Sequence, residues 1–441
     1  MADFNFKKWN LILGWFAFLI AFITYSLTVE PTVSFWDAGE YILTSSKLQV
    51  GHPPGAPFFQ MMGAFFSIFA TDPTQIGLMI NMMSATASAF TILFMFWSIV
   101  LLIKQVVKNN NESSKGQNAA ILGAAFVGSL SFAFTDSFWF NAVETEVYAM
   151  ATLIMAVLFY LGLRWGNDMF TPRGNKWLIL ISFVVGLSFG VHFMGLLTIP
   201  AIGLIYYFKN YKTITVKNFV LANLAGIAVL LFVFKLLAPN ILRYFSALEI
   251  FFVNSVGLPF NSGSIIAFVL LVGFIIFGIR YTRKKNYVNL NTALLCITFV
   301  VVGFSSWLML PIRANANVTV NENNPSSARE LLAYYNLEQY PKTHLFYGPQ
   351  FTDQYAGLDE NQPYVDDKPK YEKDKTIGKY VVVNDFKNGS QNYNSKHASL
   401  LPRMWSSEHA ENYMMYSGFL DFSIKTDYQM QNDLRSVIND F

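Results

Sequence analysis

Four side chains of the types that enzymes use to move protons and to hold anions follow the first apolar run of the chain. The stretch PTVSFWDAGEYILTSSKLQVGHPPGAP, residues 31–57, contains Asp37, Glu40, Lys47 and His52. Carboxylates accept protons from reacting groups, and lysine or histidine can stabilise a developing negative charge. This combination is compatible with an active site, and ordinary charge at a membrane interface is the alternative.

The flanking residues favour a site. Asp37 and Glu40 are three residues apart, so a helix over FWDAGEYILTSSKL would place them on one face and leave apolar side chains to lie against lipid, namely Trp36, Tyr41, Ile42 and Leu48. The prolines and glycines of GHPPGAP predict a rigid, non-helical turn that holds His52 near the same surface. A rigid polar turn between membrane helices indicates a site better than it indicates interfacial charge.

A second acidic cluster lies in TDSFWFNAVETEVYAM. Glu144 and Glu146 are two residues apart and point to different sides in most backbones, so at most one should face a site with Asp37. Glu146 could equally stabilise the start of the following helix. We therefore favour Glu144 slightly as a substrate contact and keep both readings for Glu146.

Two outer residues farther along the chain are also candidates. His192 lies among apolar residues in GLSFGVHFMG, where a packed, hydrogen-bonded role is more common than a ligand role. Arg313 directly follows the last apolar run, so it could extend to the interface or bind a phosphate with two hydrogen bonds.

The composition is that of an integral membrane protein. Charged residues make up 13% of the 441, about half the usual level of a soluble domain, and apolar residues make up 53%. The net charge of +3 and the absence of a basic block argue against a nucleic-acid partner. One cysteine, Cys296, excludes a disulfide framework and a Cys metal site within this sequence. The sequence also lacks a phosphate-binding loop, a zinc helix and a nucleophile elbow.

Apolar segments that fit membrane spans cover 9–29, 76–103, 119–134, 147–163, 219–237, 265–279 and 290–310. The segment 177–208 would be roughly 48 Å long as one helix, well beyond a hydrocarbon core of about 30 Å. We therefore predict two short crossings that turn near His192, which gives nine crossings in all. An uncleaved first helix is expected because no small-residue cleavage site follows it.

The positive-inside rule supports this topology. With nine crossings, fifteen of the eighteen Lys and Arg before Arg313 lie inside, and the three exceptions are Lys47, Lys235 and Arg243. The outer side then carries most of the acids, namely Glu30, Asp37, Glu40, Asp72, Asp136, Glu144, Glu146 and Glu249.

The predicted fold class is an all-α polytopic membrane protein with a small extracytoplasmic C-terminal α+β segment. We expect a transmembrane catalytic domain over residues 1–312, with its outer catalytic loop at 30–75, and an extracytoplasmic domain over 313–441. Within the latter, patterning predicts helix near 327–337 and a strand at 380–383.

The order of these pieces resembles the family C glycosyltransferase (GT-C) superfold. The motifs FWDAGEYILTSSKLQVGHPPGAPFF and NAVETEVYA resemble those of a bacterial membrane family, common in Bacteroidetes, that is related to a eukaryotic transmembrane protein O-mannosyltransferase. The resemblance covers residues 9–313 and continues more weakly through YYNLEQYPKTHLFYGPQF. Such relatives continue with further spans or helical repeats, so we expect a short member or a fragment.

This resemblance implies an inverting transfer of a sugar, mannose by analogy, from a polyprenyl-phosphate donor to Ser or Thr hydroxyls of exported proteins. Asp37 matches the general base and Glu40 a supporting carboxylate. The leaving phosphate needs positive charge or donors, for which the outer candidates in order are Arg313, His52, Lys47 and His192. A divalent metal is possible but not favoured, because hard cations need more oxygen ligands than the sequence places there. The expected location is the bacterial inner membrane, with the site on the periplasmic face.

Other function classes stay open at this point. A transporter would carry ionisable residues near the middle of its spans, whereas these acids gather in outer loops. An envelope scaffold is the non-enzymatic alternative, and a lipid or glycan acceptor is the alternative within glycosyl transfer.

Overall fold

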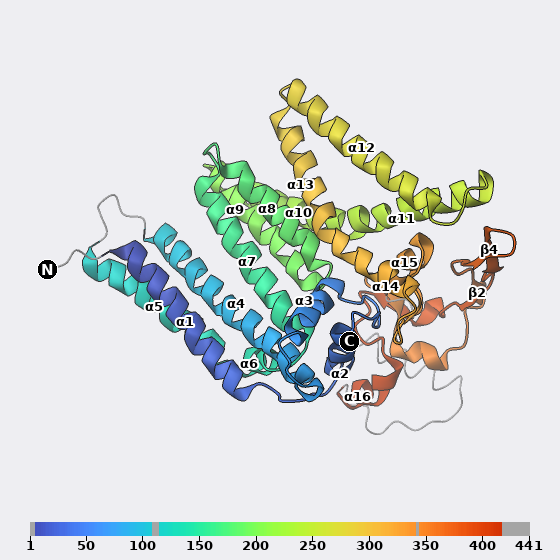
Figure 1. The fold of residues 1–441 in the computed structure, drawn as a ribbon, viewed down its shortest axis with the longest axis horizontal. Helices are drawn as coiled ribbons and strands as arrows, with labels where there is room; N and C mark the ends of the chain where they lie inside the picture. Colours follow the sequence, from blue (N-terminus) through green and yellow to red (C-terminus); the bar gives the residue numbers. More distant parts are fainter. Residues whose placement is uncertain (1–4, 108–113, 341–343, 417–441) are drawn as a thin grey trace. The chain divides into compact units, whose positions relative to one another are not determined.

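A computed structural model describes residues 5–107, 114–340 and 344–416 (Figure 1). The chain forms two compact units. The first runs up to Phe252 and resumes over Asn261–Leu337, and the second joins Val253–Phe260 to the chain after Glu338. The sequence-based boundary was 312/313, and the first unit extends beyond it because Val50 pairs with Val320 and Tyr334 binds Gly51.

The regular elements that the structure describes in the first unit are helices, apart from an isolated bridge between Val50 and Asn321. Its α-helices are α1 (Phe6–Thr28), α2 (Ala38–Ser46), α3 (Pro57–Ser67), α4 (Ile76–Val106), α5 (Lys115–Ala133), α6 (Asp136–Ala142), α7 (Val147–Asp168), α8 (Gly174–Ser188), α9 (Thr198–Asn210), α10 (Val216–Leu231), α11 (Ala238–Ile250), α12 (Ser262–Lys284), α13 (Val288–Phe304), α14 (Met309–Asn315) and α15 (Ala328–Tyr335). Short 3₁₀ or π segments join several of them, namely η1 (Pro73–Gln75), η2 (Phe193–Leu197), η3 (Phe232–Leu237), η4 (Phe251–Ser255) and η5 (Ser305–Leu308).

Six helical segments of the described chain are long and apolar enough to cross a bilayer. They are Phe6–Thr28, Pro73–Val106, Val147–Asp168, Val216–Ser255, Ser262–Lys284 and Val288–Asn315. A seventh would be α5 with α6, which are bent by 69° at the break between them. The nine predicted crossings are therefore not confirmed, because α8 and α9 have only 15 and 13 residues, fewer than the roughly 17 to 25 of a usual span.

The chain does reverse its direction near His192. Trp177 Nε1, close to the start of α8, donates a hydrogen bond of 2.8 Å to Asp168 at the end of α7. Ile205, toward the end of α9, packs against Gly166 at the same end of α7. The start of α8 and the end of α9 thus lie together, and the turn between these helices lies toward the other end of α7.

Small residues allow the long helices to approach closely. The fully buried alanines Ala17 and Ala21 of α1 pack with Ala85 and Ala89 of α4, and Figure 1 shows α1, α4 and α5 side by side. Lipid is as apolar as the side chains, so the hydrophobic effect contributes little to association between membrane helices. Van der Waals contact through close backbone approach stabilises the packing instead.

The contact between α8 and α13 depends on two glycines. A Cβ on Gly186 would overlap the carbonyl oxygen of Val300, and a Cβ on Gly303 would overlap that of Phe183. One turn beyond Gly303, the buried Trp307 donates its indole N–H to the Phe189 carbonyl at 2.9 Å. These contacts fix the turn that follows α8.

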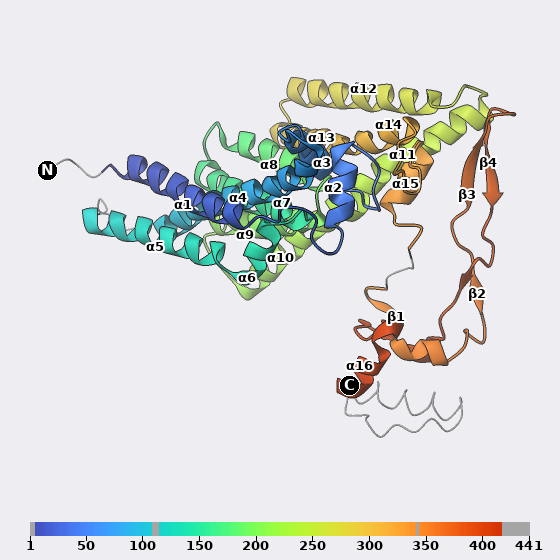
Figure 2. The same cartoon turned by 60° about the horizontal axis from the view of Figure 1, so that its bottom comes forward.

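Within the described residues of the second unit there are three antiparallel strand pairs, of which Figure 2 shows β3 beside β4. The pairs are β1 (Tyr347–Pro349) with β6 (Ala398–Leu400), β2 (Tyr364–Val365) with β5 (Ser390–Gln391), and β3 (Lys370–Asp374) with β4 (Lys379–Asn384). Its other elements are η6 (Phe351–Tyr355), η7 (Ser395–His397), η8 (Ser407–His409) and α16 (Ala410–Tyr416). The predicted strand at 380–383 is confirmed by β4, and the helix near 327–337 by α15.

Gly303→Ala should destabilise the first unit, since the new methyl group must displace the α8 backbone. We expect a loss of about 1 to 3 kcal/mol, typical of an overpacked interior, measured as a lower melting temperature of the purified protein in detergent. Gly273→Ala on α12 is the matched control, because nothing lies within 4 Å of the Cβ that it adds. Equal melting temperatures for the two variants would contradict the close contact.

Candidate active site at the start of α2

Asp37 and Glu40 occupy the first turn of α2. Asp37 is the residue before the first helical position, and its carbonyl accepts the Tyr41 N–H at 2.9 Å. Acids are favourable here because the N-terminus of a helix carries a partial positive charge. The helix predicted from the sequence is confirmed, and it directs both carboxylates to the end of the helix.

Glu40 binds His52 through both of its oxygens. Oε1 accepts the His52 backbone N–H at 2.6 Å, and Oε2 lies 2.8 Å from His52 Nδ1. The other ring nitrogen, Nε2, lies 3.8 Å from Asp37 Oδ2. The side chains of Glu40 and His52 are 28% and 26% exposed, whereas that of Asp37 is 58% exposed. Asp37 is therefore the member of this trio that a substrate can reach.

The pairing shifts both partners toward their charged forms. The hydrogen bond to Glu40 raises the pKa of His52, and the charges of Glu40, Asp37 and Glu322 raise it further against the effect of burial. The hydrogen bond from His52 lowers the pKa of Glu40. Glu322 lies beside the pair, and burial followed by the Glu40 charge raises its own pKa.

The turn that carries His52 is held by distant parts of the first unit. Tyr334 Oη donates to the Gly51 carbonyl at 2.5 Å, and Val50 donates to the Val320 carbonyl at 3.0 Å. At the end of the turn, the Gly190 carbonyl accepts the N–H groups of Phe58 and Phe59 at 2.7 and 3.0 Å, which caps α3. Gly51 itself must lack a Cβ, which would lie 2.7 Å from Glu40 Oε1.

A buried asparagine joins the two acidic segments. Asn81 on α4 donates through Nδ2 to the carbonyls of Glu30 and Thr32 at 2.7 and 3.0 Å, and its Oδ1 accepts the Thr145 hydroxyl. The Glu30 N–H donates to the Val143 carbonyl at 2.9 Å. These bonds place the loop before α2 beside the loop before α7.

Glu146 lies against Asp37. It is the residue before the first helical position of α7 and is buried, and burial, followed by the charges of Asp37 and Glu144, raises its pKa to about 7. Hydrogen bonds from the backbone N–H groups of Asp37 and Val147 oppose this rise. Glu146 is thus both at the start of a helix and next to Asp37, the two positions that the sequence left as alternatives. Burial also raises the pKa of Glu144, whose neighbouring charge is Glu30.

Tyr41 packs between His52 and Phe59. Its ring centroid is 5.2 Å from that of Phe59 and 5.8 Å from that of His52. Burial raises the pKa of its phenol, with smaller contributions from Glu146, Asp37 and Glu40. The expectation that Tyr41 and Ile42 lie against lipid is wrong, because both are buried in the core that α2 shares with α3 and α4.

Arg313 holds the end of α2. Its Nε donates to the Leu48 carbonyl at 2.5 Å and its Nη2 to the Lys47 carbonyl at 3.0 Å. Lys47 is the residue that follows the last helical position of α2, and Leu48 is the next residue of the chain. The guanidinium is thus engaged with the backbone, and the Lys47 side chain is exposed.

His192 is packed as a neutral ring. Its Nδ1 accepts the Met194 N–H at 3.1 Å, and its ring centroid lies 5.3 Å from that of Tyr148. Burial lowers its pKa. The packed role considered from the sequence fits these contacts better than a role as a cation.

Among residues 5–107, 114–340 and 344–416, no group of three or more His, Cys, Asp or Glu side chains is arranged to hold a metal ion.

The sequence analysis did not identify four residues of this site, namely Asn81, Thr145, Glu322 and Tyr334. Of these, Asn81 had a signal, since a polar residue within the apolar run 76–103 needs a partner.

Comparison with known proteins finds sequences that are similar to this region. Residues 37–215 match the family model described as "Protein O-mannosyl-transferase TMEM260 N-terminal domain", and residues 341–432 match a family of unknown function, DUF8416. The first match includes Asp37, Glu40, His52 and Glu146 and ends before Arg313.

Two curated relatives carry the same name as the family. The chain is 26% identical over 243 residues to protein O-mannosyl-transferase tmem260 of Dictyostelium discoideum, which is 52% of this chain and 28% of the relative. It is 24% identical over 164 residues to protein O-mannosyl-transferase TMEM260 of Mus musculus, which is 37% of this chain and 21% of the relative. The chain therefore spans between a fifth and a third of the length of these relatives. No solved structure matches.

Glu40→Gln should remove a pH-dependent part of the stability. Because the pKa of His52 is raised, its contribution is complete below its usual 6.5 and is lost as pH rises through the raised value. Because the pKa of Glu40 is lowered, its contribution is complete above its usual 4.5 and is lost as pH falls through the lowered value. The melting temperature of the wild type should exceed that of Glu40→Gln most between these two usual values.

The measurement is a series of melting temperatures in detergent from acidic to alkaline pH. Asp72→Asn serves as the control, since Asp72 is an exposed acid that accepts the Thr74 N–H at 2.9 Å within its own turn. If the difference in melting temperature between the wild type and Glu40→Gln stays constant with pH, the charged Glu40–His52 pair is contradicted.

Proposed function

We propose that this chain is part of a membrane glycosyltransferase that moves a sugar, mannose, from a polyprenyl-phosphate donor to Ser or Thr hydroxyls of exported proteins. The observation that carries the proposal is the exposed carboxylate of Asp37 beside the Glu40–His52 pair, at the start of a segment that matches the N-terminal domain of protein O-mannosyl-transferases. The names of the two relatives support transfer of mannose to protein.

In this mechanism Asp37 is the general base. The acceptor hydroxyl oxygen attacks the anomeric carbon on the face opposite the phosphate, and its proton passes to Asp37. The bond between the anomeric carbon and the phosphate oxygen breaks, and its electron pair leaves with the polyprenyl phosphate, so the configuration inverts. Glu40 acts through His52, which it holds in one orientation by two hydrogen bonds.

The charge of the site supports binding of an anionic donor despite its carboxylates. Glu40 and Asp37 raise the pKa of His52 and so favour its protonated form, which, 3.8 Å from Asp37, would offset the negative charge of the departing phosphate. Glu146, with a pKa of about 7, loses its negative charge toward slightly acidic pH. We therefore rank His52 before Arg313 for this role, because the Arg313 guanidinium already binds two backbone carbonyls.

The location and topology in this proposal are those that the sequence predicts. The chain is placed as a multi-pass protein of a bacterial inner membrane, with a GT-C-like arrangement of about nine crossings and the site on the periplasmic face. The reaction is proposed to need no metal, since proton acceptance and phosphate stabilisation are assigned to Asp37 and His52.

Asp37→Asn should abolish most of the activity while the protein still folds. The amide keeps the shape of the side chain but cannot accept the hydroxyl proton, so turnover should fall roughly 10²- to 10⁴-fold. The measurement is transfer of radiolabelled mannose from polyprenyl phosphate to a Ser/Thr peptide by the purified protein.

Two variants make this test specific. Glu40→Gln should reduce turnover less than Asp37→Asn, because it acts only through His52. Asp72→Asn, on an exposed outer turn, should leave turnover near that of the wild type. Near wild-type transfer by the Asp37→Asn protein would remove the assignment of the base.

A further inference from the structure

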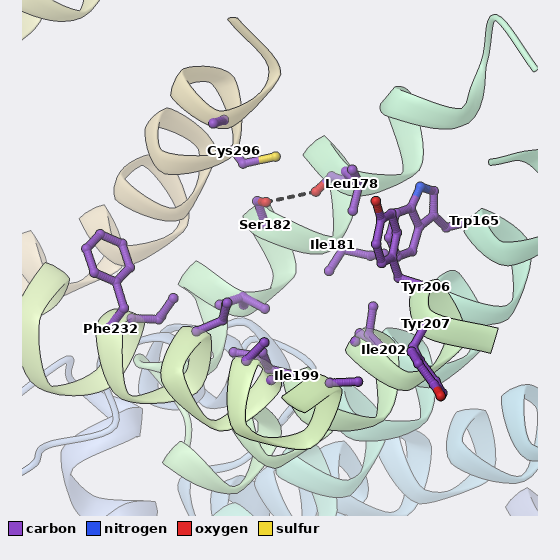
Figure 3. Close-up of a pocket in the computed structure, with 18 of the residues that line it drawn as sticks. Trp165, Leu178, Ile181, Ser182, Ile199, Ile202, Tyr206, Tyr207, Phe232 and Cys296 are labelled. Atoms are coloured by element: carbon purple, nitrogen blue, oxygen red, sulfur yellow. Dashed lines mark hydrogen bonds between the residues drawn. The ribbon is translucent and has the colours of Figure 1, made fainter. Parts of the chain in front are cut away.

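A large cavity in the first unit lies far from Asp37. It has a volume of about 850 Å³ and is bordered by α7, α8, α9, α10 and α13 (Figure 3). Along α7, about 28 Å of helix separate Glu146, beside Asp37, from Trp165 in the cavity wall. Its volume is in the range of about 300 to 1,000 Å³ that is usual for ligand sites.

The wall of the cavity changes in polarity from one end to the other. Figure 3 shows Trp165 and Tyr206 on one side of the cavity and Phe232 on the other. At the first end the wall also contains Tyr207 and Asn218, which hydrogen-bond to each other at 2.5 Å. Between the ends, Ser182 donates its hydroxyl to the Leu178 carbonyl at 2.8 Å and so needs no ligand. The cavity suits a molecule with a long apolar part and a polar end.

The polar end of the cavity coincides with the basic ends of the surrounding helices. Lys209 is in the last turn of α9, Lys217 is in the first turn of α10, and both are exposed. Lys176, in the first turn of α8, is exposed as well. The nearby acid, Asp168, is engaged by the Trp177 indole. A negatively charged group at this end of the cavity would therefore meet several cations.

The depth of the cavity in the membrane identifies the apolar part of its ligand. The segments that contain α7, α10 and α13 are among those long and apolar enough to cross a bilayer, so the cavity lies at the depth of the hydrocarbon chains. On α10, the lining residues Leu221 and Val229 are exposed, which leaves the cavity open along that helix. An acyl chain can enter from the bilayer without crossing a polar surface.

We propose that this cavity binds one acyl chain of an anionic phospholipid, whose headgroup lies among Lys176, Lys209 and Lys217. The lipid comes from the leaflet at the basic ends of the helices, which is the side opposite Asp37 along α7. This site is separate from the proposed transfer reaction and does not depend on it.

Photolabelling of the intact protein in vesicles tests the site. The probe is a phosphatidylglycerol with a photoreactive acyl chain, in phosphatidylcholine vesicles, and labelled peptides are identified by mass spectrometry. We expect labels on the peptides of α10 and α13 that line the cavity. Ala225→Trp places a large side chain in the cavity and should reduce this labelling severalfold. Ala228→Trp, on the same helix but outside the cavity lining, is the matched control and should label like the wild type.

The headgroup is tested separately. Lys209→Ala and Lys217→Ala should each reduce labelling by about fivefold, the effect expected for one lysine near an anionic lipid surface. A photoreactive phosphatidylcholine should label the same peptides less than the anionic probe does. The proposal is overturned if Ala225→Trp labels like Ala228→Trp, if both probes label equally, or if added polyprenyl phosphate displaces the anionic probe.

Discussion

The arrangement of the candidate site depends on one carboxylate that binds two groups of the same residue. Glu40 accepts the His52 backbone N–H and lies in hydrogen-bond range of its imidazole, so it fixes both the path of the turn and the orientation of the ring. A Cβ at Gly51 would lie 2.7 Å from Glu40 Oε1 and would displace the carboxylate from this position. The pairing of Glu40 with His52 also leaves Asp37, one helical turn away, as the carboxylate that is free to face solvent. The more buried carboxylate of Glu40 thus makes the close hydrogen bonds to His52, and the more exposed carboxylate of Asp37 makes only the longer 3.8 Å contact with the same ring.

A cluster of acids is costly unless some of them are paired or neutral. His52 pairs with Glu40, and burial, followed by the charges of Asp37 and Glu144, raises the pKa of Glu146 to about 7. Asn81 and Thr145 hold the two acidic loops together without adding charge. Neutral hydrogen bonds therefore join the two acidic loops, while the raised pKa values of His52 and Glu146 both favour protonated forms, which reduce the repulsion between carboxylates.

Local patterns in the sequence predicted the local structure well. The helix at α2, the non-helical turn of GHPPGAP, the helix α15 and the strand β4 all follow from residues within the segment itself. The partners of Arg313 could not be predicted in this way, because they are backbone carbonyls some 265 residues earlier in the chain. The proximity of Glu146 to Asp37 depends likewise on how α4 and α7 pack. Nine crossings are not confirmed by the helices that are long enough, since charge patterning gives the side of a loop but not the length of the helix before it.

The turn that carries His52 has a further consequence for how the protein is assembled. The hydrogen bond from Tyr334 to Gly51 joins residues 283 positions apart, and the Val320 carbonyl comes almost as late in the chain. During synthesis the turn that carries His52 therefore emerges with α2 and α3 before its partners exist. It can form these hydrogen bonds only after the helices up to α15 have been made and packed. Closing so long a loop is slow compared with forming a helix. A nascent chain would thus form its helices well before the candidate site becomes ordered, because the loop that carries His52 lacks its partners until the first unit is nearly complete.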